Sequence, residues 1–157
     1  FDGDILTPTN AYLLNLGLES MDVRMARHCA NGMAAAEFLS AQPKGAHVVY
    51  PGLPGDSYHA LAQKYLPRGS CGVVSFDVMG GRAAAERFMA ALRLCTIETH
   101  VADSHTCCLH PASSTHRQMT DEELGAAGIG PAMVRLSCGL EGAEDIVADL
   151  DQALAAM

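Results

Sequence analysis

The strand pattern at residues 72–79 constrains this chain most. In GVVSFDVM, the large apolar residues Val74, Phe76 and Val78 occupy every second position, which is typical of a β-strand that buries one face. A second run, MVRLSC at residues 133–138, is similarly short and apolar. Short strands of this kind need helices packed over their apolar face. The sequence therefore predicts an α/β fold of the α+β type.

Helical and strand patterns fill most of the remaining chain. Residues 1–7 have the composition of a tail or connector, and Pro8 opens a helical stretch that reaches about residue 40, with a break expected near Gly17. The other expected elements are a strand at 46–50, helices at 57–65 and 82–94, strands at 96–101 and 106–109, a short helix opened by a capping box at 120–123, and a helix at 142–156.

This order predicts one small domain. The economical arrangement is a mainly antiparallel sheet of about four strands, with helices on one face and a long N-terminal helix. The leucines at positions 13, 14, 16 and 18 make the first part of that helix apolar nearly all round. A helix of this kind is predicted to be buried on several sides.

Composition narrows the class of function. The chain has 157 residues and a formal net charge of −8, so it fits one domain and does not have the basic surface that binds nucleic acids or anionic membranes. No apolar run is long enough to span a bilayer, and no signal peptide opens the sequence. The six cysteines are scattered, which favours reduced thiols and a cytoplasmic setting. Because the chain starts at Phe1 rather than Met, we expect a piece of a longer polypeptide.

A single arginine lies inside the second strand pattern. Arg135 shares one face of the expected strand with Met133 and Ser137, and the five residues between it and Glu141 include no acid. An arginine cannot lose its charge, so burial requires a partner. A ligand carboxylate or phosphate could bind it through two hydrogen bonds. The alternatives are an exposed arginine or one paired with a distant acid.

The polar run HTCCLHPASSTH at residues 105–116 is the second candidate for a site. Long polar loops in compact domains are often functional, and this one offers hydroxyls and imidazoles. A metal site built from Cys107, Cys108 and the histidines is one alternative, although the spacing matches no common zinc pattern. A nucleophilic cysteine paired with histidine is another, although nothing nearby would stabilise a thiolate. A solvated loop with hydroxyl-capped turns is the third.

Several segments resemble the C-terminal domain of the Cys/Met-metabolism enzymes that depend on pyridoxal phosphate. The matching stretches are LTPTNAYLLNLGLESMDVRMARHCANGMAAAEFL, VVYPGL, QKYLPRGSCGVVSFDVMGGRAAAERFM, HPASSTH, TDEELGAAGI and VRLSCGLEGAEDIVADLDQAL. They span almost the whole chain, and HPASSTH together with VRLSCGLE is the specific pair. The family includes cystathionine synthase and lyase, methionine lyase and O-acetylhomoserine sulfhydrylase, and the likeness is greatest to the last of these.

The resemblance implies roles for particular residues. Arg135 would bind the α-carboxylate of an amino-acid substrate, and Thr106, at the place of a family serine, would help to hold the same carboxylate. Asp103 matches an acid that would shape the loop. The other supporting residues of the active-site loop would be His110, Ser113, Thr115 and His116.

The resemblance also implies what lies outside this chain. Such an enzyme needs a lysine that forms a Schiff base with the cofactor, and neither Lys44 nor Lys64 has the family's Ser-x-Thr-Lys setting. Pyridoxal phosphate would be bound mainly by an absent N-terminal domain, and this piece alone would be inactive. The intact enzyme would be a homotetrameric transferase of methionine biosynthesis and transsulfuration, which replaces the acetate of O-acetylhomoserine with sulfide or a thiol. The alternatives are a cystathionine or methionine lyase, a cystathionine synthase, or a stand-alone regulatory or interaction domain.

Overall fold

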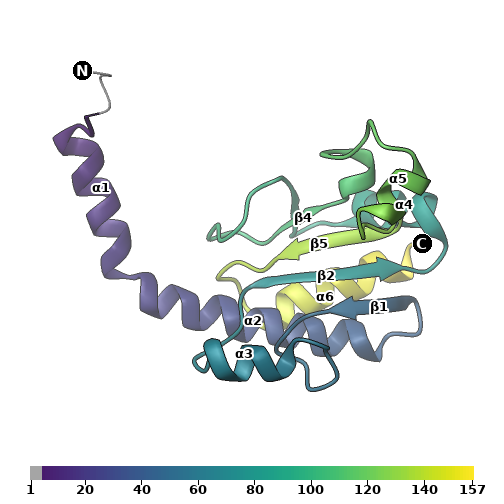
Figure 1. The fold of residues 1–157 in the computed structure, drawn as a ribbon, viewed down its shortest axis with the longest axis horizontal. Coiled ribbons are helices and arrows are strands. Elements are labelled where there is room, and N and C mark those ends of the chain that lie inside the picture. The colour runs from purple at the N-terminus through teal and green to yellow at the C-terminus, as the bar shows by residue number, and fades with distance from the viewer. Residues whose placement is uncertain (1–4) are drawn as a thin grey trace.

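One mixed sheet forms the centre of the computed structural model, which describes residues 5–157 (Figure 1). In this part of the chain, five strands are arranged in the order β1-β2-β5-β4-β3. They are β1 (Gly45–Val49), β2 (Val73–Val78), β3 (Thr96–Ile97), β4 (Cys107–Leu109) and β5 (Met133–Ser137). All neighbouring pairs are antiparallel except β3 and β4. The predicted α/β class and mainly antiparallel sheet are confirmed; all five strand segments named from the sequence join one sheet, which was expected to have about four strands, and β3 is shorter than expected.

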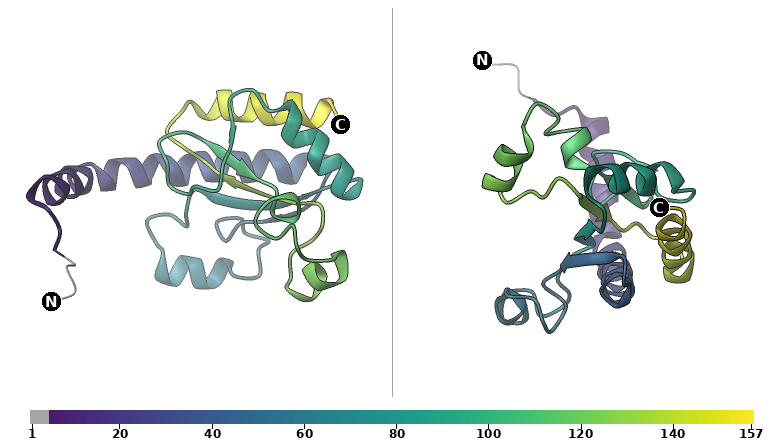
Figure 2. Two further views of the ribbon diagram at one scale, coloured as in Figure 1. Left: turned by 90° about the horizontal axis from the view of Figure 1, so that it is seen from above. Right: turned by 90° about the vertical axis from the view of Figure 1, so that its right-hand side faces the viewer.

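Three helices cover one face of the sheet. Figure 2 shows α2 (Met21–Ala41), α4 (Gly81–Ala91) and α6 (Ala143–Ala155) on the same side of the strands. The predicted alternation in β2 is confirmed, because Val74, Phe76 and Val78 are buried against these helices. The shorter helices are α3 (His59–Tyr65), α5 (Asp121–Ala126) and the 3-10 turn η1 (Pro111–Ser113). Thr120 and Glu123 form the predicted capping box at the start of α5.

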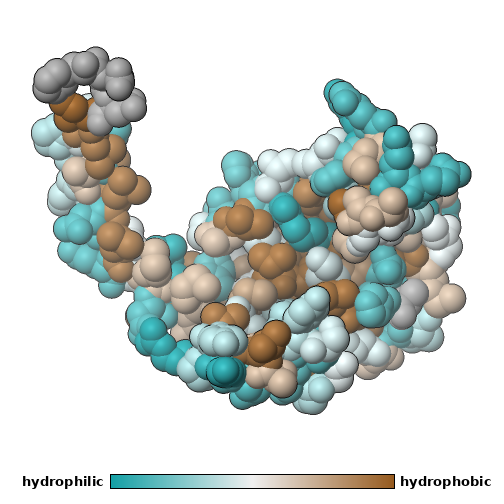
Figure 3. Space-filling view, in the orientation of Figure 1, coloured by the Kyte–Doolittle hydropathy of each residue, from teal (hydrophilic) through white to brown (hydrophobic). Residues whose placement is uncertain are grey.

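The first helix does not pack against this core. Helix α1 (Pro8–Glu19) ends at Ser20, where the chain bends into α2, so the expected break is present. The prediction that α1 is buried on several sides is wrong within this chain: Leu14 is 61% exposed and Leu18 is 58% exposed. Figures 1 and 3 show the helix projecting from the body with apolar residues along it. The first four residues of the expected tail lie outside the described residues.

A buried carboxylate fixes the segment between α4 and β3. Asp149 of α6 is 5% exposed and accepts hydrogen bonds from the backbone N–H groups of Arg93, Leu94 and Cys95 at 2.9, 2.9 and 2.8 Å. The Gln152 side chain donates to it at 2.9 Å. These contacts tie the entrance of β3 to the helical layer.

The second face of the sheet is largely free of helices. Ser75, Arg135 and Leu109 lie side by side on it, since Ser75 pairs with Arg135 and Arg135 pairs with Leu109. The candidate site is on this face. None of the helices described in residues 5–157 is both long and apolar enough to cross a membrane.

Candidate functional site

Arg135 is half-buried and only partly paired. Its Nη2 donates to the carbonyl oxygens of Thr99 and His100 at 2.8 and 3.3 Å. Its Nε is buried and has no hydrogen-bond partner among the described residues. None of the ion pairs in residues 5–157 involves it. The guanidinium therefore has hydrogen-bond donors that these residues do not satisfy.

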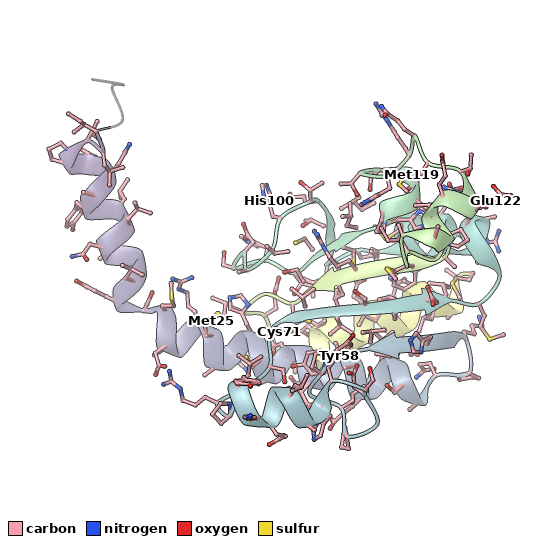
Figure 4. All side chains as sticks on the ribbon, in the orientation of Figure 1. Met25, Tyr58, Cys71, His100, Met119 and Glu122 are labelled. Carbon is pink, nitrogen blue, oxygen red and sulfur yellow. The ribbon has the colours of Figure 1, made fainter. Side chains whose placement is uncertain are left out.

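The loop between β3 and β4 lies over Arg135. Figure 4 shows His100 on this loop, above the sheet. The loop is fixed to the strands beneath it: the Ala102 N–H donates to Ser137 Oγ at 3.1 Å, and the Cys107 thiol donates to the His100 carbonyl at 3.1 Å. Ala102 has a φ of +58°, an uncommon conformation for a residue with a Cβ. Hydrogen bonds thus join the β3–β4 loop both to the Arg135 guanidinium and to the strands beneath it.

Thr106 lies on the other side of this arrangement from Arg135. It is fully buried, and its hydroxyl donates to Glu141 Oε2 at 2.7 Å while accepting from the Gly139 N–H at 2.8 Å. Its backbone N–H donates to Glu141 Oε1. Side chains alternate along β4, so Cys107 and Leu109 share the face of Arg135 and Thr106 does not. The structure therefore does not bring Thr106 and Arg135 together around one ligand.

The other predicted loop residues form local pairs. His110 is buried; its Nε2 lies 2.9 Å from the Pro131 carbonyl, so Nε2 carries the proton and Nδ1 accepts from the Ser113 hydroxyl at 2.8 Å. Thr115 Oγ1 lies 2.9 Å from His116 Nδ1. The His110 contact connects η1 to the segment before β5, and the Thr115–His116 pair is local; neither contact involves the guanidinium.

Asp103 shapes the turn that leads into β4. Its Oδ1 accepts from the His105 backbone N–H at 2.9 Å and lies 3.2 Å from His105 Nδ1. The backbone N–H and the imidazole of His105 lower the pKa of the Asp103 carboxyl. Together with Thr96, Glu98 and Cys107, both residues line a hollow of about 260 Å³. Two acids at this hollow make it unsuitable for an anion.

The cysteines have the properties of buried thiols. Burial raises the pKa of Cys107 and of Cys138. The pKa of Cys108 is also raised, through its hydrogen bond with Cys95 and through burial. A raised pKa reduces the thiolate fraction that a nucleophile or metal ligand needs. These contacts give no support to the nucleophile hypothesis.

Sequence reasoning missed the residues that position the end of β5. Glu141 accepts both hydrogen bonds from Thr106, and Asn31 of α2 donates to the carbonyl oxygens of Gly139 and Glu141 at 2.9 and 3.0 Å. His28 of α2 lies 2.7 Å from the Cys138 carbonyl through Nδ1. The sequence signal was the spacing of His28 and Asn31 on one face of a helix. Their partners lie about 110 residues away.

The two lysines do not fit a cofactor site. Lys44 Nζ donates to the Leu154 carbonyl at 2.8 Å near the end of α6. Lys64 Nζ lies 5.0 Å from the centre of the Tyr65 ring on α3. Neither is on the open sheet face beside Arg135. Both lysines thus make their contacts away from the Arg135 guanidinium.

Fold and site define an α/β domain with an incompletely paired arginine on the sheet face opposite its three long helices. The family model of the Cys/Met metabolism PLP-dependent enzymes matches residues 2–155. The chain belongs to that family, whose members depend on pyridoxal phosphate.

Relatives show the same likeness over nearly the whole chain. O-acetyl-L-homoserine sulfhydrylase 1 of Thermus thermophilus is 44% identical over 153 residues, which cover 98% of this chain and 36% of that protein. An L-methionine gamma-lyase of Fusobacterium nucleatum is 41% identical over 97% of this chain and 38% of its own length. A crystal structure of a Campylobacter jejuni protein described as a putative O-acetylhomoserine (thiol)-lyase, with a pyridoxyl-lysine group, superposes with a TM-score of 0.89 at 40% identity. That alignment covers 98% of this chain and 36% of the solved one. The chain thus spans little more than a third of these relatives.

Proposed function

We propose that this chain is the C-terminal, substrate-orienting domain of a longer O-acetylhomoserine sulfhydrylase-like enzyme. The intact enzyme would eliminate acetate from O-acetylhomoserine and add sulfide or a thiol. The proposal rests on family membership and on the incompletely paired Arg135 of the uncovered sheet face. We assign the cofactor and its lysine to the N-terminal remainder of the polypeptide, because Lys44 and Lys64 are engaged elsewhere. The isolated domain is then inactive.

Arg135 would bind the α-carboxylate of the substrate. Its Nε is buried without a partner and its Nη2 is fixed by two carbonyl oxygens, so the plane of the guanidinium is set before a ligand arrives. A carboxylate that accepts hydrogen bonds from such a fixed guanidinium is oriented as well as attracted. The substrate would thereby be held with its reacting carbon at a fixed place relative to the cofactor.

The HPASSTH segment would support this site from one side. His110 and Ser113 join η1 to the Pro131 carbonyl, and Asp103 shapes the turn before β4. Thr115 and His116 lie at the end of the same loop. We assign these residues a supporting role, and we assign Thr106 to the fixation of the loop through Glu141 rather than to direct contact with the carboxylate.

The test is Arg135→Lys in the intact enzyme. A lysine keeps the charge but loses the planar pair of donors. Loss of such a contact costs about 2–4 kcal/mol, so kcat/KM for the amino acid should fall about 30- to 1,000-fold. Arg87→Lys, on the exposed side of α4, is the matched control and should leave kcat/KM unchanged. An unchanged KM for the amino acid in Arg135→Lys contradicts the proposal.

A lyase of the same family is the second candidate, because methionine gamma-lyases are about as similar to this chain as the sulfhydrylases are. Turnover of the intact enzyme with and without added sulfide separates the two. Sulfide-dependent turnover of O-acetylhomoserine supports the sulfhydrylase, and sulfide-independent release of a thiol from methionine supports the lyase. We also infer a homotetramer, which only the family resemblance suggests, and a cytoplasmic setting, which agrees with the free cysteines of the described residues.

A further inference from the structure

The carboxylate of Glu141 lies between the two segments that meet behind Arg135. We propose that Glu141 is a positioning residue for the Arg135 guanidinium. Its carboxylate holds Thr106, Thr106 ends the β3–β4 loop, and that loop carries the carbonyl oxygens that bind the guanidinium. This inference rests on the proposed role of Arg135 in carboxylate binding. Glu141 itself would not contact the substrate.

The first step is the junction between Glu141 and the end of the β3–β4 loop. Both carboxylate oxygens are used there, one by the Thr106 N–H at 2.6 Å and one by the Thr106 hydroxyl at 2.7 Å. The same hydroxyl accepts from the Gly139 N–H, and the Leu140 N–H donates to the Ser104 carbonyl at 2.8 Å. Four hydrogen bonds therefore join residues 104–106 to the segment that leaves β5.

The second step is the close approach at Gly139. A Cβ at this position would lie 2.5 Å from the Ser104 carbonyl oxygen, the His105 carbonyl carbon and Glu141 Oε2. Only glycine allows the two segments to come this close. The junction therefore has little room to shift while its hydrogen bonds are intact.

The third step connects this junction to the guanidinium. The loop fixed at residues 104–106 also carries the Thr99 and His100 carbonyl oxygens that accept from Arg135 Nη2. Between these carbonyl groups and residues 104–106, the Ala102 N–H donates a hydrogen bond to Ser137 Oγ of β5. Because the loop is fixed at both places, the two carbonyl groups have a defined position, and so does the guanidinium plane.

The fourth step is the support from the helical layer. Asn31 of α2 donates to the Glu141 and Gly139 carbonyl oxygens, and His28 of the same helix bonds to the Cys138 carbonyl. The segment that carries Glu141 is therefore anchored to the core and not to the loop alone. The motion that Glu141 restricts is that of the loop.

A carboxylate suits this position better than an amide. Both donors come from Thr106, and both oxygens of Glu141 accept. In Glu141→Gln, one oxygen becomes an NH2 group that cannot accept, so one Thr106 donor loses its partner. The side-chain volume is unchanged, and the backbone contacts of Asn31 remain. The variant thus loosens the loop with little effect on the core.

The experiment measures Glu141→Gln in the intact enzyme. Because Glu141 acts on the substrate only through the loop, only part of the lost hydrogen-bond energy should reach substrate binding: KM for the amino-acid substrate should rise about three- to tenfold, with kcat within about twofold of wild type. Peptides covering residues 98–106 should exchange amide hydrogen faster, and peptides from α4 and α6 should not. Thr106→Ser keeps the hydroxyl and should retain the wild-type KM. Thr106→Val combined with Glu141→Gln should raise KM no more than the larger single effect, because both act at one contact.

Asp149→Asn is the matched control. Asp149 also accepts backbone N–H groups ahead of a strand, but its hydrogen bonds reach residues 93–95 and Gln152 and, within the described part of the chain, none reaches the β3–β4 loop or Arg135, so its substitution should lower Tm and leave KM unchanged. If KM rises in both variants in proportion to the loss of Tm, Glu141 has only a structural role and the inference is overturned. If Arg135→Lys raises KM and Glu141→Gln does not, the inference fails while the proposed function stands. If neither Arg135→Lys nor Glu141→Gln raises KM, the proposed function is contradicted, and the inference that rests on it fails as well.

Discussion

Asp149 offers a stability measurement whose size can be worked out from its contacts. In Asp149→Asn, the remaining oxygen can still accept from Leu94 and Cys95, as Oδ2 does in the wild type. The new NH2 group then faces the Arg93 N–H and the Gln152 amide, two donors that had bonded to Oδ1. Two hydrogen bonds to a charged acceptor are lost, at a cost of about 2–4 kcal/mol. For a chain of this length, that lowers Tm by roughly 5–15 °C.

The stability that Asp149→Asn loses should become smaller as the pH falls into the acid range. Burial alone raises the pKa of Asp149, but the backbone N–H groups of Cys95, Arg93 and Leu94 lower it by more, so the pKa lies below its ordinary value. A depressed folded-state pKa gives stability that is present above the unfolded value of about 3.9 and is lost as the pH falls through the folded value. Asparagine does not titrate. The difference between wild type and variant should therefore be constant from about pH 5 to 8 and shrink below about pH 4.

The assay is urea unfolding of wild type and variant, followed by circular dichroism at several pH values between 3 and 8. The linear slopes should agree, so that the difference in midpoint reports stability alone. A difference below about 0.5 kcal/mol at pH 7 would show that Asp149 is not the anchor that its contacts indicate. A difference that stays constant down to pH 3 would refute the assignment of the effect to the ionised carboxylate.

Two other outcomes follow from burial and exposure. The buried thiols of Cys107 and Cys138 have raised pKa values. In the folded chain at pH 7, an aromatic disulfide reagent should therefore label them at least about tenfold more slowly than after unfolding. Equal labelling rates, measured by mass spectrometry of the labelled peptides, would contradict this. The exposed leucines of α1 favour self-association of the isolated chain. The double substitution Leu14→Glu and Leu18→Glu should therefore lower the particle mass that light scattering measures for this chain. An unchanged mass would exclude α1 as the surface through which the copies associate.

The elements were predictable where the pattern is local. The alternation in β2 and the capping box at Thr120 depend on neighbours in the sequence, and both are confirmed in the structure. The expected strand at 96–101 was too long because its second half continues as the loop that contacts Arg135. A sequence pattern does not contain that contact, which joins residues 35 or more positions apart.

Helix α1 shows the other limit of sequence reasoning. Its apolar circumference predicts burial, yet every residue of the helix is exposed in this chain. The pattern indicates that the apolar surface of the helix is to be buried, but it does not identify the segment or chain that buries it. Since the relatives extend well beyond the aligned region, the wrong prediction for this domain agrees with the proposal that it belongs to a longer chain.

Thr106 shows why the candidate site was only partly predictable. Its hydroxyl was expected to help hold a substrate carboxylate, because the family resemblance places Thr106 at the position of a serine with that role. In this structure the hydroxyl contacts Glu141, which lies 35 residues away; the VRLSCGLE motif contains this residue, but nothing in the sequence pairs it with Thr106. Arg135 was singled out because an arginine in an apolar strand violates the local pattern, and violations of this kind cluster at functional sites; its role in binding a ligand stays a prediction.

The charge around Arg135 decides how an anion could bind there. The chain has a net charge of −8, and the acids Glu98 and Asp103 line the hollow next to the guanidinium's loop. A general positive field that would collect anions is therefore absent from these surroundings, and affinity would have to come from hydrogen bonds with the guanidinium. Hydrogen bonds of that kind depend on the orientation of the guanidinium plane far more than a charge field does. Fixation of Arg135 by its loop, and of the loop by Glu141, is then what such a site requires.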